Sequence, residues 1–63
     1  MTNAQIVAAR TVSRQFPEIV IEKVGNRLVP VRGGVRGNNV VVTNEMNPSS
    51  VKQALLDACA ALQ

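Results

Sequence analysis

Apolar residues recur at helical spacing near the start of the chain, on a stripe formed by Ile6, Ala9, Val12 and Phe16. Thr2 followed by Gln5 matches the capping-box pattern with which many helices begin. Pro17 disfavours helical backbone geometry at the residue before it. The pattern therefore predicts a helix over residues 2–15 whose apolar stripe faces the core.

The strongest helical periodicity lies at the other end of the chain. Its apolar positions are Val51, Ala54, Leu55, Ala58, Cys59 and Leu62. Asn47 is a favourable N-cap residue, and Pro48 suits the first position of a helix. We therefore predict a second helix over residues 48–62.

The segments between the two helices are rich in β-branched residues. They predict strands over residues 18–24, 27–32 and 40–43, the first two joined by a two-residue turn at Gly25 and Asn26. In that register one face carries Val20, Glu22, Val24, Arg27, Val29 and Val31, and the other carries Ile19, Ile21, Lys23, Leu28, Pro30 and Arg32. Because neither face is polar throughout, we expect the helices to cover one face and a partner to cover the other.

Pro30 restricts how the second strand can pair. The turn register places Pro30 opposite Ile21 at a non-hydrogen-bonded pair, so the missing N–H would point away from the first strand. The second strand is therefore an edge at this point, or is bulged, or pairs incompletely with the strand that follows.

Together the elements predict an α+β fold. Residues 1–63 form a single small domain of order α-β-β-β-α, with an antiparallel three-stranded sheet and both helices packed on one face. The pattern leaves open whether the third strand pairs with the second or with the first.

The composition suggests that this domain has a partner. A 63-residue chain that is 46% hydrophobic with Phe16 as its only aromatic residue has a small core, and such a core supplies about 3–5 kcal/mol. With one cysteine and no histidine, neither an intramolecular disulfide nor a structural metal site is expected, and no cofactor is implied. Oligomerisation or docking on another protein is the remaining source of stability.

The residues needed for catalysis are missing or scattered. Cys59 lies on an apolar helical stripe and has no histidine to activate it. Glu18, Glu22 and Glu45 are spread over two strands and a loop, which gives no acid–base pair. We therefore expect no catalytic residues and a protein that is not an enzyme.

A basic, glycine-rich segment at residues 31–40 is the most distinctive motif in the chain. Its candidate contact residues for phosphates or an acidic partner are Arg32, Gly33, Gly34, Arg36 and Gly37, together with Arg10 and Arg14 on the first helix. A formal net charge of +3 is consistent with a polyanionic partner. The favoured interpretation is nevertheless a hairpin connection in which glycine supplies positive φ angles.

Two resemblances follow from the element order. The α-β-β-β-α order resembles the double-stranded-RNA-binding domain and small toxins of that fold, although a single lysine, Lys52, stands where that domain carries a lysine cluster and the toxins' histidine is missing. The first helix, the hairpin turn and the helix from Pro48 to Leu62 are similar to head-completion proteins of tailed phages. Neither resemblance assigns the chain to a family.

The favoured function is a non-enzymatic interaction or assembly module, of the kind found among viral or accessory proteins, that forms a homo-oligomer or docks on a protein partner. The predicted interface residues are Val20, Val29, Val31, Val40 and Val42. Nucleic-acid binding through the basic loop is the alternative. No signal peptide is recognised and no apolar run approaches the ~20 residues of a membrane span, so we expect a cytoplasmic location, or the virion or host cytoplasm for a viral protein.

Overall fold

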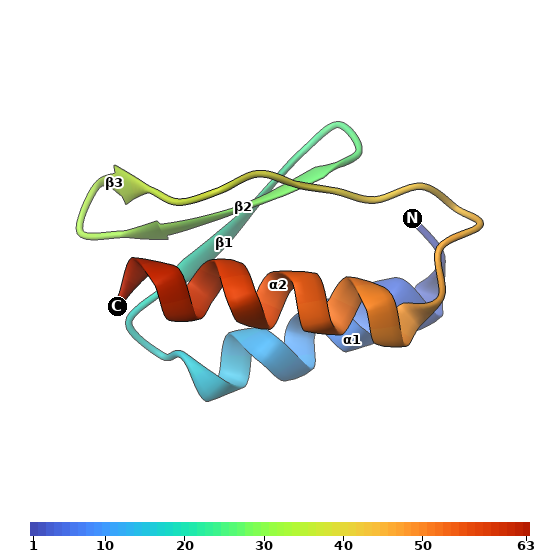
Figure 1. The fold of residues 1–63 in the computed structure, drawn as a ribbon, viewed down its shortest axis with the longest axis horizontal. Coiled ribbons are helices and arrows are strands. Elements are labelled where there is room, and N and C mark those ends of the chain that lie inside the picture. The colour runs from blue at the N-terminus through green and yellow to red at the C-terminus, as the bar shows by residue number, and fades with distance from the viewer.

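A computed structural model describes all residues from 1 to 63 and confirms the α+β fold (Figure 1). The elements are α1 (Asn3–Gln15), β1 (Val20–Val24), β2 (Arg27–Arg32), β3 (Val35–Arg36), β4 (Val40–Val41) and α2 (Pro48–Leu62). Helix α2 lies against the sheet, and α1 packs against α2 on the same side of the sheet. Neither helix is long and apolar enough to cross a membrane.

Both helices begin at the residues that their capping patterns indicate. At α1, the Gln5 N–H donates to Thr2 Oγ1 at 3.2 Å and the Thr2 N–H donates to Gln5 Oε1 at 3.0 Å, so the capping box is complete. At α2, the Ser49 N–H donates to Asn47 Oδ1 at 2.9 Å. These local side-chain contacts satisfy backbone donors that the first helical turn leaves unpaired.

The β1–β2 hairpin has the predicted register, with Val20 opposite Val31 and Val24 opposite Arg27. Gly25 has a φ of 60°, the positive angle that a tight two-residue turn needs at its first position. On its other side β2 pairs with both β3 and β4, so the third strand lies beside the second and β1 forms one edge of the sheet.

The third strand is divided by a β-bulge opposite Pro30. Val31 faces Arg36 and Leu28 faces Val40, so two residues of β2 stand opposite three residues, 37–39, of the returning chain. The Gly37 N–H donates to the Pro30 carbonyl at 2.8 Å, but Pro30 has no N–H to return. The structure thus confirms incomplete pairing of β2 with the chain that follows, with the extra residue in that returning chain, and it places Pro30 in the central strand rather than at an edge.

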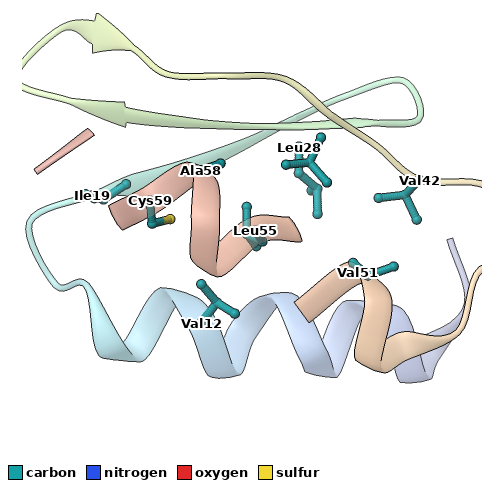
Figure 2. Close-up of a cluster of buried hydrophobic side chains, with 9 residues drawn as sticks. Val12, Ile19, Leu28, Val42, Val51, Leu55, Ala58 and Cys59 are labelled. Atoms are coloured by element: carbon teal, nitrogen blue, oxygen red, sulfur yellow. The ribbon is translucent and has the colours of Figure 1, made fainter. Parts of the chain in front are cut away.

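The hydrophobic core lies between α2, α1 and the inner face of the sheet, defined here as the face that the helices cover (Figure 2). Its buried members are Val12, Ile19, Leu28, Val40, Val42, Val51, Leu55, Ala58 and Cys59. Figure 2 shows Leu55 between Val12 of α1 and Leu28 of β2. The predicted stripe of α2 and three of the four predicted stripe residues of α1 supply the helix side of this core, whereas Ile6 lies outside the cluster.

One buried polar residue, Gln5, was not expected in the interior. Its side chain is 0% exposed, and its Nε2 donates to the Thr43 carbonyl at 2.8 Å and to the Met46 carbonyl at 2.9 Å. Since Oε1 also accepts the capping-box hydrogen bond from Thr2, the amide is paired at both ends. Gln5 thereby fastens the segment before α2 to the first turn of α1.

Candidate functional site

The outer face of the sheet, which the helices do not cover, carries three valines that are more than half exposed. They are Val20 at 65%, Val24 at 51% and Val41 at 52%. Register places Val20 opposite Val31, and Arg27 opposite both Val24 and Val41, so all five side chains share this face. We call Val20, Val24, Val31 and Val41 the outer valine patch.

An ion pair divides the outer valine patch. Arg36 Nη2 lies 3.6 Å from Glu22 Oε1, and these two residues belong to the strands on either side of β2. Their side chains therefore meet above the central strand, where Val29 is only 4% exposed although it lies outside the main core. Because both charged side chains remain solvent-exposed, the pair contributes at most about 1 kcal/mol.

The predicted interface residues separate into two groups. Val20 and half-buried Val31 lie on the outer face, and Val29 is on that face beneath its neighbours. Val40 and Val42 are 6% and 2% exposed and belong to the core. These two valines therefore leave the candidate interface, and the exposed Val24 and Val41 enter it. The sequence alternation already placed Val24 on this face, whereas Val41 required the bulged register.

The three glycines of residues 31–40 serve the hairpin geometry. Gly33 and Gly34 have φ angles of 56° and 82° and form the two-residue turn between Arg32 and Val35. Positive φ at both central residues is typical of a type I′ turn. At Gly37 an added Cβ would lie 3.0 Å from Pro30 Cγ, so the bulge brings the backbone close to that ring. These contacts favour the interpretation of this segment as a hairpin connection.

The basic residues proposed for nucleic-acid contact point in different directions. Arg32 Nη2 lies 3.8 Å from Glu18 Oε2. The strand register places Arg32 on the inner face of the sheet and Arg36 on the outer face. Arg10 lines a groove beside α1, and Arg14 is exposed on the same helix. Arg32 and Arg36 therefore lie on opposite faces of the sheet, and each has a glutamate partner, which gives less support to a single phosphate-binding loop.

A groove of about 290 Å³ lies between α1 and β1. Its apolar lining consists of Met1, Ile6, Ala9, Ile21 and Leu28. Its polar residues are Arg10, Ser13 and Lys23, and the exposed cations of Arg10 and Lys23 have no carboxylate within 4 Å. The sequence indicates the basic flank of the helix but not this groove, because Lys23 reaches it only through the fold.

Cys59 and the four carboxylates are the side chains to consider as metal ligands. Cys59 is 0% exposed in the core, and burial raises the pKa of its thiol. No group of three or more cysteine, aspartate and glutamate residues lies together. Cys59 packs as a small apolar side chain in this environment.

We expect the Cys59 thiol to react with iodoacetamide at least roughly a hundredfold more slowly in the folded chain than in urea, because the reagent reaches the buried sulfur only after unfolding. The alkylation rate followed by mass spectrometry at constant pH measures this protection. Free cysteine under both solvent conditions is the control for the effect of urea on the reagent. Equal rates in the folded and unfolded chain would contradict the buried position.

Comparison of the chain with protein-family models, with curated proteins and with solved structures finds no match in any of the three.

Proposed function

We propose that this chain is a non-enzymatic interaction module that self-associates through the outer valine patch. The observation that carries the proposal is the exposure of Val20, Val24 and Val41, each more than half accessible on one face of the sheet. Several exposed apolar side chains on one uncovered sheet face favour a protein–protein contact site there. A second copy would cover the face that the two helices leave open.

The small size of the chain supports this proposal. Only 12 of 63 residues are buried, and a core this small contributes about 3–5 kcal/mol. Burial of apolar surface adds about 25 cal/mol for each Å² removed from water. Association through the valines would therefore add stability that the isolated fold cannot obtain from its own core.

The outer face carries charges of both signs, so a second copy of the same chain can be paired with it. Each copy presents one carboxylate, Glu22, and two guanidinium groups, Arg27 and Arg36. In a two-fold arrangement, Glu22 of one copy can approach Arg27 of the other while Arg36 retains its own contact with Glu22. Two-fold contacts of this kind use the same residues from both copies.

The double variant Val20→Lys/Val41→Lys tests the proposal. We expect the unmodified chain to form a dimer in analytical ultracentrifugation and the double variant to be a folded monomer, because two lysines would have to be desolvated at the interface. Val7→Lys is the matched control, since Val7 is 59% exposed but lies on α1. A monomeric unmodified chain at high concentration, or equal dissociation by Val7→Lys, would refute the proposal. Circular dichroism verifies that each variant is folded.

A further inference from the structure

We propose that the groove between α1 and β1 binds a small amphiphilic anion, namely a monocarboxylate with one short apolar chain. The apolar chain would lie against Ile6, Ile21 and Leu28, and the carboxylate would lie between Arg10 and Lys23. The site is separate from the outer valine patch, because Ile21, Lys23 and Leu28 belong to the inner face of the sheet.

The size and lining of the groove restrict the ligand. Its volume of about 290 Å³ is just below the range of about 300–1,000 Å³ for small-molecule sites. Five of its eight lining residues are apolar. This space and its mainly apolar lining suit a single short alkyl chain.

The charges of the groove determine the head group. Arg10 comes from the helix wall and Lys23 from the strand wall, so two cations approach the apolar lining from opposite sides. Two arginines outside the groove, Arg32 and Arg36, already have glutamate partners at 3.8 Å and 3.6 Å. The groove cations have none, and a carboxylate beside an apolar wall would interact with them more strongly than it does in bulk water.

Ser13 adds a neutral hydrogen-bonding group to the same wall. It lies three residues after Arg10 on α1, which places the two side chains on adjacent turns of one helix face. A carboxylate has two acceptor oxygens and can bind a hydroxyl and a guanidinium group at the same time. The groove thus offers two cations, one hydroxyl and an apolar lining, the combination that a short-chain amphiphilic anion requires.

Titration with octanoate, followed by amide chemical shifts in NMR spectra, tests this site. We expect saturable shifts at the groove residues below the concentration at which octanoate aggregates. Acetate has the same head group without the chain, and octanol has the chain without the charge. Both should bind at least about tenfold more weakly, because each makes only part of the contacts. Equal binding of octanol, or no saturable binding of octanoate, would overturn the proposal.

Charge-neutral variants identify the head-group contacts. Arg10→Gln and Lys23→Gln should each weaken octanoate binding by roughly three- to tenfold through loss of a charge-assisted contact. Arg14→Gln is the matched control, because Arg14 is on the same helix but does not line the groove. Arg14→Gln should leave the affinity unchanged, and an equal loss in this variant would show that only the net charge matters and overturn the site. The Val20→Lys/Val41→Lys variant of the outer face should bind octanoate as the unmodified chain does. Octanoate binding therefore tests the groove independently of self-association.

Discussion

Replacing Gln5 with alanine should lower the free energy of unfolding by about 3 kcal/mol, because the substitution removes the partners of three backbone groups. The Gln5 amide donates to the Thr43 and Met46 carbonyls at 2.8 and 2.9 Å and accepts from the Thr2 N–H at 3.0 Å. An alanine at this position restores none of these contacts and leaves space in the 0% exposed site. Against a total stability of about 3–5 kcal/mol, a large fraction of the variant should be unfolded at room temperature.

Thermal and urea denaturation followed by circular dichroism measure this loss. Gln15→Ala is the matched control, because Gln15 is exposed at the last position of α1. This control should change the free energy of unfolding by less than about 0.5 kcal/mol. Equal stability of the Gln5→Ala variant and the unmodified chain would contradict a structural role for the Gln5 amide.

Gln5 also shows which part of an interaction the sequence can reveal. Its role in the capping box was visible, because Thr2 and Gln5 are three residues apart and form a local motif. Its bonds to Thr43 and Met46 join residues 38 and 41 positions away. No periodic pattern records contacts over that distance, so the helical spacing assigned Gln5 no place in the core.

The sheet also has one part that local sequence determines and another that depends on long-range contacts. A two-residue turn determines the register of its own hairpin, and β1 and β2 pair as that turn predicts. The third strand was predicted over residues 40–43, but the returning chain forms β3 at Val35–Arg36, inside the segment predicted as a loop, and then β4 at Val40–Val41. Its division depends on Gly37 meeting the proline ring and carbonyl of Pro30, a contact between two strands that the third-strand sequence alone does not specify.

The division of the third strand decides which of its residues belong to the candidate interface. Successive residues of a strand point to opposite faces, so the register decides which valine of the segment 40–42 is accessible. The structure places Val40 and Val42 in the core and leaves Val41 52% exposed. The ion pairs of Arg32 and Arg36 also depend on strand order, because their glutamate partners come from the chain around β1. The sequence therefore indicates which residues are apolar or basic, but it does not determine the face of the sheet on which each of them lies.

Leu55→Ala should lower the free energy of unfolding by about 2–5 kcal/mol, the range found for leucine truncation in closely packed interiors. Leu55 is 0% exposed and belongs to a core of nine buried residues. It lies on α2, which contacts both α1 and the sheet, so the lost methyl groups leave a cavity where the two layers meet. With only about 3–5 kcal/mol available, the isolated variant should be largely unfolded.

Leu56→Ala is the matched control, because it makes the same substitution one position further along α2 at a half-buried residue. We expect a loss of about 1 kcal/mol there, since part of the leucine side chain is already in contact with water.

Urea denaturation at several protein concentrations measures both losses and separates the contribution of the core from that of the interface. Association shifts unfolding by mass action, so a self-associating chain becomes more stable as its concentration rises. If the outer valine patch forms the proposed dimer, raising the concentration should partly recover the fold of Leu55→Ala, but not when Leu55→Ala is combined with Val20→Lys and Val41→Lys. Recovery in both backgrounds would place the dimer contact elsewhere on the molecule.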